Sequence, residues 1–234
     1  LVDLKGEAKN AAGRVNFFYI VDTDLPLPPE EIIIRADSDI DDLQGYDNDP
    51  EVFISWEPTF DETSDVIGYM YSTADGGMTD NGIFTENTQV VFDGLVEGLN
   101  EIYVWSVDSA RNYGPSQVAT VFYDDDLPSF GIPNPAPGSW VNTNTVNYEM
   151  VINDEDGSGV RGSTVEYAVS YDGGMTYSAW EPTNLRNEGE QVTVKVFLNF
   201  REGEGNFIRW RAKDISGNGY IESEPFQVKV DTVP

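Results

Sequence analysis

Apolar residues alternate with other residues at a period of two along most of this chain. Such a period is typical of β-strands that turn one face toward a core, whereas an amphipathic helix repeats about every 3.6 residues. Glycine, proline, asparagine and aspartate interrupt the runs about every 8–12 residues, as expected of a β-sandwich, and no convincing amphipathic helix is found. The alternating sets are Val52, Ile54 and Trp56; Ile102, Val104 and Ser106; Val146, Tyr148, Met150 and Ile152; Val165, Tyr167, Val169 and Tyr171; Val192, Val194, Val196 and Leu198; and Phe226, Val228 and Val230.

The chain also repeats itself. Residues 100–112 align without a gap with residues 206–218, at an offset of 106 residues, and both segments lead into a β-rich run and then an acidic junction. A period near about 100 residues indicates tandem domains, because solenoid repeats run about 20–50 residues. The matching pairs are Ile102 with Ile208, Val104 with Trp210, Ser106 with Ala212, Asp108 with Asp214 and Asn112 with Asn218, and the junctions are 21–26, 123–128 and 230–234.

This repeat predicts the domain organisation. Residues 1–23 are expected to be the C-terminal strands of an upstream repeat, residues 24–125 one complete domain, and residues 126–234 a second. Residues 231–234 resemble the start of another linker. We therefore expect the chain to be a piece of a longer array.

Particular motifs carry a family resemblance. Residues 52–58 (VFISWEP), followed by 68–71 (GYMY), resemble strands B and C of a fibronectin type III domain, and residues 94–104 resemble its E–F turn and strand F. The resemblance implies that Trp56 anchors the core. The corner tyrosine of that family is replaced by Ile102 and Ile208, as in a divergent branch.

The second domain resembles the immunoglobulin-like repeats of large bacterial and archaeal surface proteins. Its segments 156–160 (DGSGV), 172–174 (DGG), 214–218 (DISGN) and 228–234 (VKVDTVP) follow the order usual in those repeats. The predicted fold class is therefore all-β, with tandem immunoglobulin-like (fibronectin type III-like) β-sandwiches. This fold serves widely as a spacer and display module, so function has to be argued from sites.

Composition narrows the chemistry. The sequence has no cysteine and no histidine, and 42 Asp plus Glu against 13 Lys plus Arg give a formal net charge of −29. Disulfides, thiolate or imidazole catalysts and Cys- or His-ligated metals are thereby excluded. The charge repels phosphate backbones and anionic lipid, and no apolar run reaches the roughly 18 residues of a membrane span. We expect no nucleic-acid partner, no membrane insertion in this segment, no catalytic residue and no enzymatic activity.

The remaining chemistry is that of oxygen ligands. A sandwich array is expected to gather the A–B loop, the exit of the last strand and the B–C and F–G loops of the next domain at one junction. Clustered carboxylates repel one another, and Ca²⁺, which takes about 6–8 oxygen ligands, removes that penalty. The candidate calcium ligands are Asp37, Asp39, Asp41, Asp42, Asp47, Asp49, Asp124, Asp125, Asp126, Asp154, Asp156 and Asp214.

Each of these signals has a plainer interpretation. The spacing of Asp37, Asp39 and Asp41 resembles the start of an EF-hand loop, but Asp42 stands where that loop has glycine, and Asn48 where it has glutamate. The high content of acidic residues also fits a protein adapted to high salt, in which the charges only keep the surface hydrated. The segments 108–112 and 214–218 have the composition of turns.

Aromatic and glycine-rich segments leave a glycan role open. Residues 170–177 (SYDGGMTY) resemble the Asp-box, a hairpin in which Asp caps backbone N–H groups and glycine supplies positive φ; residues 72–79 are a looser copy. Trp56 and Trp210 are predicted to be core residues. The remaining candidates for stacking on sugar are Tyr103 and Trp105, on the outward face of their strand, and Trp140 and Trp180 near strand ends. The favoured alternative is that these rings cover a neighbouring strand or fill the domain junction.

Two functions compete. The favoured one is a non-catalytic structural or adhesion region of an extracellular or cell-surface protein, whose calcium-stiffened junctions join neighbouring repeats and whose partner is another surface protein or a glycan. The alternative is a carbohydrate-binding accessory module of a secreted polysaccharide-degrading enzyme. A glycosidase built on paired carboxylates is disfavoured, because it needs a concave cleft that a sandwich array does not offer.

Overall fold

The computed structural model describes residues 3–9, 15–36, 45–74 and 82–233, without the side chains of residues 3–20 and 36. Within those residues the chain is built of β-strands and one 3₁₀ turn, Gly162–Thr164. It divides into two compact units, each treated by itself below. Unit 1 comprises residues 1–37, 51–95 and 99–121, and unit 2 comprises residues 38–50, 96–98 and 122–234.

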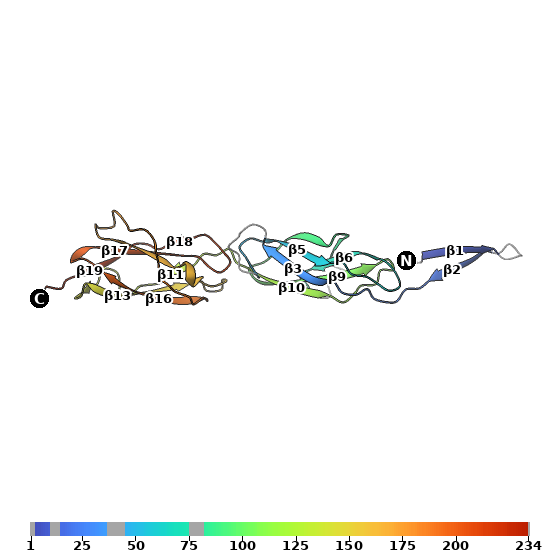
Figure 1. Cartoon of the computed structure of the whole chain (residues 1–234), viewed down its shortest axis with the longest axis horizontal. Helices are drawn as coiled ribbons and strands as arrows, with labels where there is room; N and C mark the ends of the chain where they lie inside the picture. The colour runs from blue at the N-terminus through green and yellow to red at the C-terminus, as the bar shows by residue number, and fades with distance from the viewer. Residues whose placement is uncertain (1–2, 10–14, 37–44, 75–81, 234) are drawn as a thin grey trace. The chain divides into compact units, whose positions relative to one another are not determined.

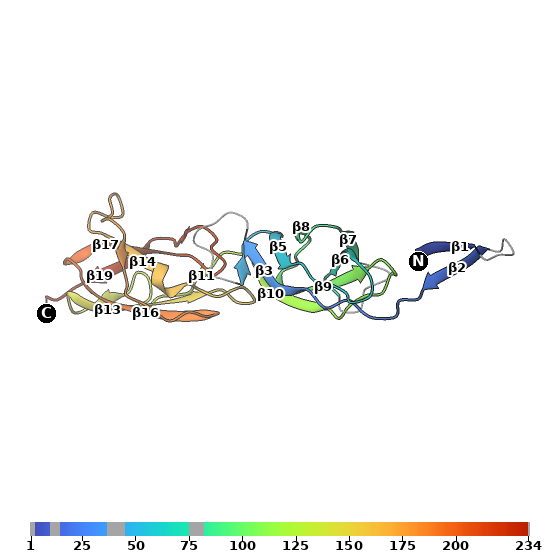
Figure 2. The ribbon, with the colours of Figure 1, turned by 45° about the vertical axis from the view of Figure 1, so that its right-hand side comes forward.

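Unit 1 contains two antiparallel sheets that follow the order of a fibronectin type III sandwich (Figures 1 and 2). One sheet has the order β3 (Glu30–Ala36), β5 (Glu51–Glu57) and β8 (Gln89–Asp93). The other has the order β10 (Gln117–Tyr123), β9 (Gly98–Asp108), β6 (Val66–Ser72) and β7 (Ile83–Thr85). The N-terminal strands β1 (Asp3–Lys9) and β2 (Val15–Ile20) pair with each other in a separate antiparallel sheet.

The predicted alternation forms the core of unit 1. Val52 and Ile54 of β5 are fully buried, as are Ile102 and Val104 of β9. Trp56 packs edge-on against Tyr69 of β6, with ring centroids 5.3 Å apart, as the resemblance to strands B and C implies. A buried aromatic pair of this kind adds about 0.5–1.5 kcal/mol beyond the burial of its area.

Trp105 decides between the two interpretations of the outward-facing aromatic residues. It lies on the face of β9 opposite Ile102 and Val104, yet only 2% of it is exposed. The ring of Tyr103 stacks beside it at 6.2 Å, and every residue of β9 from Val104 to Asp108 is buried. Both faces of this half of the strand are therefore covered, and Trp105 is not a surface for a ligand.

Unit 2 repeats the two-sheet plan. One sheet has the order β11 (Ser129–Phe130), β13 (Thr145–Asn153) and β16 (Gln191–Asn199). The other has the order β12 (Trp140–Val141), β19 (Phe226–Val230), β17 (Gly203–Ala212), β14 (Glu166–Ser170) and β15 (Glu181–Pro182), with β18 (Ile221–Glu222) paired to β17. The short strand β4 (Tyr46–Asp47) pairs in parallel with Phe122 and Tyr123 at the end of β10.

The core of unit 2 lies between these sheets. In β13 and β16 alternate residues are buried over nine positions, because each strand turns one face inward. Trp210 of β17 is fully buried against Tyr148 of β13, with ring centroids 6.2 Å apart, which confirms it as a core residue. The structure therefore confirms the all-β immunoglobulin-like fold, and no helix of the described residues is long and apolar enough to cross a membrane.

Candidate metal centre

Three buried aspartates converge in unit 2. Asp124 follows β10, Asp154 follows β13, and Asp214 lies two residues beyond β17. Each contributes a carboxylate oxygen to a group in which all oxygens lie within 4.8 Å of one another. Exposed fractions are 0% for Asp124, 5% for Asp154 and 0% for Asp214. From the sequence, these three aspartates are expected together, because the exit of one domain's last strand should meet the B–C and F–G loops of the next domain at one junction.

Backbone N–H groups fix the three carboxylates. Oδ2 of Asp124 accepts a hydrogen bond from the Ser158 amide at 2.6 Å, and Oδ2 of Asp154 accepts one from the Gly159 amide at 2.7 Å. Oδ1 of Asp214 accepts from the amides of Gly217 and Asn218 at 2.8 and 2.9 Å. The predicted turn interpretation of residues 214–218 is thus confirmed, and the same turn aims Asp214 at its neighbours.

Asn218 ties the segments together. Its Nδ2 donates to Oδ2 of Asp214 at 2.6 Å and to the carbonyl oxygens of Asp124 and Asp126 at 2.8 and 3.0 Å. One amide group therefore joins the loop after β17 to the segment after β10. The carboxylates hold their positions through this framework, without an ion pair to any residue that the structure describes.

The surroundings of Asp154 and Asp214 disfavour the ionised forms of these two carboxyls. Burial foremost, together with the charges of Asp124, Asp214 and Asp126, raises the pKa of Asp154 to about 6, although the hydrogen bond from the Gly159 amide acts the other way. Burial also raises the pKa of Asp214, although its bonds from Asn218 act the other way. Two ionised carboxylates 4.8 Å apart repel by about 3–4 kcal/mol at an effective dielectric constant of about 20.

Unit 1 contains a second group of three aspartates, none of which was among the predicted ligands. Asp22, Asp61 and Asp108 each place a carboxylate oxygen within 4.8 Å of the others. Asp108 accepts from the amide of Asn112 and from its Nδ2, both at 2.7 Å, and the same Nδ2 donates to the carbonyl of Asp22 at 3.3 Å. These three bonds correspond to those of Asn218 with Asp214 and with the Asp124 carbonyl in unit 2.

Two oxygens of the unit 1 trio lack a partner. Oδ2 of Asp22 and Oδ2 of Asp61 are both inaccessible to solvent and make no hydrogen bond within the described part of the chain. Their Oδ1 atoms are engaged by the amide of Asp24 and by those of Thr63 and Ser64. A buried carboxylate oxygen without a donor is costly, and a cation is the kind of group that satisfies it.

Both trios border an open pocket. A pocket of about 250 Å³ in unit 2 is lined by Asp154 together with Asp126 and Glu155. One of equal volume in unit 1 is lined by Asp61, Asp24 and Glu62. The trio oxygens are hard ligands of the type that Ca²⁺ selects, and one aspartate of each trio lines the neighbouring pocket.

The other predicted ligands lie in different surroundings. Asp47 is buried. Its carbonyl accepts a hydrogen bond from the Asp124 amide at 3.0 Å, and its Oδ1 accepts one from the Asp49 amide at 3.2 Å.

The remaining predicted ligands among the described residues, Asp125, Asp126 and Asp156, are exposed. The Asp126 carbonyl accepts from Asn218, and the Asp125 carboxylate accepts from the Tyr123 hydroxyl at 3.1 Å. Asp156 is exposed in the loop after Asp154, with φ of 66°. Asp37, Asp39, Asp41 and Asp42 lie outside the described residues.

The structure thus shows an all-β, immunoglobulin-like fold in which each unit holds a group of three aspartates. No family model and no curated protein matches the chain. Among solved structures it is similar to the fibronectin(III)-like modules of CbhA from Clostridium thermocellum, with 18% identity over 86% of this chain and 93% of that one and a TM-score of 0.38.

Two further solved structures are similar to a comparable degree. The chicken CNTN1 FN1–FN3 domains share 14% identity over 94% of this chain and 72% of theirs, with a TM-score of 0.34. Chitinase ChiA74 from Bacillus thuringiensis shares 13% identity over 87% of this chain, with a TM-score of 0.35, and the match spans 29% of that enzyme's length. These likenesses concern the fold, and the activities of those proteins are not transferred to this chain.

Proposed function

We propose that this chain is a non-catalytic repeat region of an extracellular or cell-surface protein, and that its aspartate trios bind Ca²⁺. The observation that carries the proposal is the group of Asp124, Asp154 and Asp214, three buried carboxylates held within 4.8 Å that form no ion pair with any residue described in the structure. Ionising all three without a counter-ion is unfavourable, and a divalent cation removes that repulsion.

The ion joins segments that are far apart in sequence. In unit 2 it connects the residue after β10 with the loops after β13 and β17, and in unit 1 it connects residue 22 with the loops that contain Asp61 and Asp108. Such a cross-link restricts the segments that lead into each repeat. In a longer array it would stiffen the junctions between neighbouring repeats and so present a distal domain, for contact with another surface protein or a glycan.

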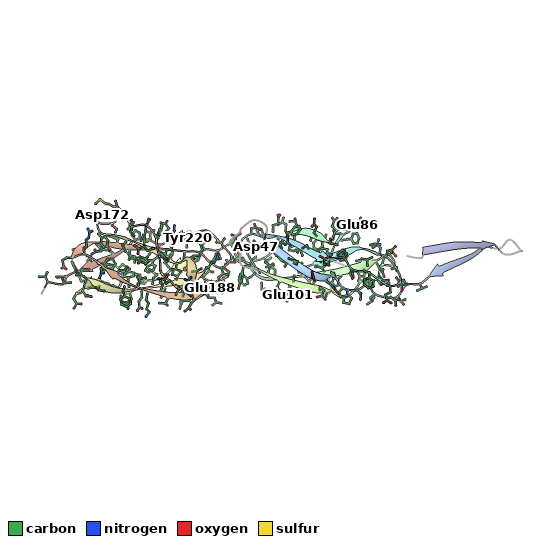
Figure 3. The ribbon with its side chains drawn as sticks, viewed as in Figure 1. Asp47, Glu86, Glu101, Asp172, Glu188 and Tyr220 are labelled. Atoms are coloured by element: carbon green, nitrogen blue, oxygen red, sulfur yellow. The ribbon has the colours of Figure 1, made fainter. Side chains whose placement is uncertain are left out.

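Ca²⁺ fits better than Mg²⁺. The trios offer carboxylates, and carbonyl oxygens of Asp124 and Asp126 lie beside them, which suits the large and flexible coordination shell of Ca²⁺. Mg²⁺ requires a strict octahedron and keeps much of its water. The competing explanation, acidity that solvates the surface at high salt, draws on side chains such as Glu86, Glu101 and Glu188, which project from the units (Figure 3).

Calorimetric titration separates the two explanations. Chelator-stripped protein is titrated with CaCl₂, with MgCl₂ and with NaCl at matched ionic strength, and melting temperatures are recorded in parallel. The proposal expects saturable heat and a raised melting temperature with Ca²⁺ at millimolar concentration or below. Stabilisation by NaCl alone, with no specific response to Ca²⁺, would support surface solvation and reject the calcium proposal.

A further inference from the structure

The Asp-box-like segment of unit 2 is a rigid hairpin. Oδ1 of Asp172 accepts from the amides of Met175 and Thr176 at 3.0 and 2.9 Å and from the Ser170 hydroxyl at 2.7 Å, while Oδ2 accepts from the Thr176 hydroxyl at 2.5 Å. These bonds, the Thr176 hydroxyl foremost, lower the pKa of Asp172 to about 2. Asp172 therefore serves the hairpin, and its oxygens are not the groups that a ligand would use.

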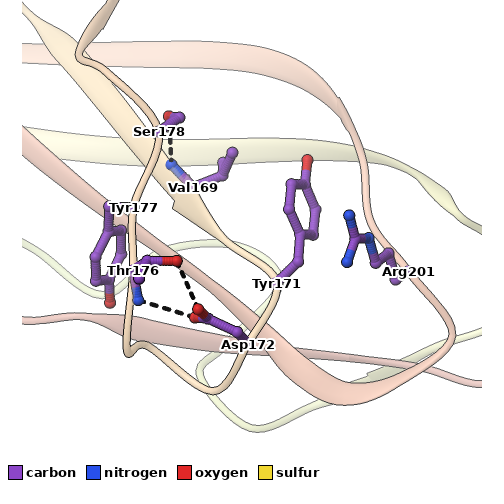
Figure 4. A pocket seen from close by; sticks show the side chains of 7 residues that line it. All are labelled: Val169, Tyr171, Asp172, Thr176, Tyr177, Ser178 and Arg201. Atoms are coloured by element: carbon purple, nitrogen blue, oxygen red, sulfur yellow. Dashed lines mark hydrogen bonds between the residues drawn. The ribbon is translucent and has the colours of Figure 1, made fainter.

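A pocket of about 290 Å³ opens beside this hairpin (Figure 4). In the figure the Tyr171 ring lies between Arg201 and the Thr176–Ser178 segment. The Arg201 guanidinium carbon lies 4.7 Å from the centroid of the Tyr171 ring. An aromatic ring and a multiple hydrogen-bond donor thus line the same small space. Its wall is formed by Val169, Tyr171, Asp172, Thr176, Tyr177, Ser178 and Arg201.

Arg201 differs from the other arginines of this unit that cover aromatic rings. Arg209 and Arg211 are held by Glu222 and Glu166 and cover Trp180 at 4.7 and 4.6 Å from its centroid. Tyr220 in turn lies under Arg211 at 4.2 Å. Arg201 covers the Tyr171 ring at a similar distance, 4.7 Å. Unlike Arg209 and Arg211, it makes no ion pair with any described residue, so no carboxylate occupies its N–H groups.

This chemistry matches one sugar ring. The C–H face of a pyranose stacks on an aromatic side chain, and its hydroxyl oxygens accept hydrogen bonds from a guanidinium, which has five N–H donors. The net charge of −29 opposes polyanionic ligands. We propose that the pocket of Tyr171 and Arg201 binds a ring of a neutral saccharide, a role independent of the metal centres.

The test uses the whole chain and calorimetric titration with cellohexaose, xylohexaose and chitohexaose, in EDTA and again in CaCl₂. At least one of these saccharides should bind equally well in both buffers. Tyr171→Ala should weaken that binding at least about tenfold, and Arg201→Gln about three- to tenfold. Tyr171→Phe, which keeps the ring and loses only the hydroxyl bond to the Asn199 carbonyl, should bind nearly as well as the parent.

Tyr220→Ala is the matched control, because it removes an exposed ring of the same unit that does not line the pocket. It should leave the affinity unchanged, and melting temperatures establish that every variant is folded. Failure of all three neutral saccharides to bind would overturn the proposal. So would equal losses for Tyr171→Ala and Tyr220→Ala, or preferential binding of an acidic probe such as trigalacturonate.

Discussion

Replacing Asp154 with Asn should have opposite effects with and without Ca²⁺. The pKa of Asp154 is raised by burial from 3.8 to about 6, so between those values the folded state holds a proton that the unfolded state has released. The free energy of unfolding therefore falls as pH rises through this window. A shift of about 2 units corresponds to about 3 kcal/mol at neutral pH, an upper limit to the stability that Asp154→Asn regains in a chelator.

With Ca²⁺ present the sign should reverse. The parent gains RT ln(1 + [Ca²⁺]/Kd), about 2.7 kcal/mol when the ion is at about 100 times its Kd. Asp154→Asn removes one of three carboxylates and should weaken affinity at that centre at least about tenfold, because affinity for Ca²⁺ follows the charge of the ligand set. The Asn side-chain oxygen still accepts from the Gly159 amide, so a simple loss of the loop is not expected.

Chemical denaturation at pH 7 measures both effects, in EDTA and in 1 mM CaCl₂. Asp156→Asn is the matched control, because it removes the same charge from the same loop at an exposed position with φ of 66° that asparagine tolerates. The control should keep the calcium response of the parent. The reasoning is refuted if Asp154→Asn is less stable than the parent in EDTA and shows an undiminished stabilisation by Ca²⁺.

Three further variants test separate parts of the structure. Asp61→Asn should abolish one calcium equivalent by calorimetry and leave the unit 2 equivalent intact; loss of both, or of neither, would contradict independent trios. The Asp172 carboxyl should titrate by NMR near pH 2, so its contribution to the hairpin is present above about 3.8 and lost as pH falls through 2; titration near 4 would contradict it. Gly162→Ala places a Cβ against the Asn187 carbonyl and should cost about 1–3 kcal/mol in denaturation, whereas Gly219→Ala, with open space, should cost little; equal costs would refute this packing argument.

The strands and most of the core follow from the sequence, because a period of two encodes the buried face of a strand. Trp56, Trp210 and the alternate residues of β13 and β16 lie where the pattern places them. Trp105 occupies the outward face that the pattern gives it and is nevertheless buried, because the period says which face a residue occupies but not whether another segment covers that face. Coverage of β9 on both sides depends on segments that are distant in sequence.

The unit 2 trio could be expected from the sequence, because sandwich topology predicts that the exit of one domain's last strand meets the B–C and F–G loops of the next domain. The unit 1 trio carried the same signal in Asp108 and Asn112, which align with Asp214 and Asn218. The third member, Asp61, could not be aligned with Asp154, because the two loops differ in length. The Ser109 amide donates to the Asp65 carbonyl in unit 1, as the Ile215 amide donates to the Gly159 carbonyl in unit 2. Asp61 and Asp154 precede these equivalent carbonyls by different numbers of residues.

The spacing of acidic residues also failed to show which aspartates join the trio. Asp154 and Asp156 are both aspartates of the same loop, but only Asp154 is buried beside Asp124 and Asp214. Asp156 is exposed and takes the left-handed backbone conformation. Which of two nearby carboxylates points inward is decided by the backbone of the loop. That information resides in the bonds from Ser158, Gly159 and Asn218 and not in the spacing of acidic residues.

The most direct test of the central claim is a calorimetric titration of the chelator-stripped chain with Ca²⁺. The account predicts saturable binding of two equivalents, one for each trio, with a parallel rise in melting temperature. A titration without heat, together with a melting temperature that Ca²⁺ leaves unchanged, would contradict it.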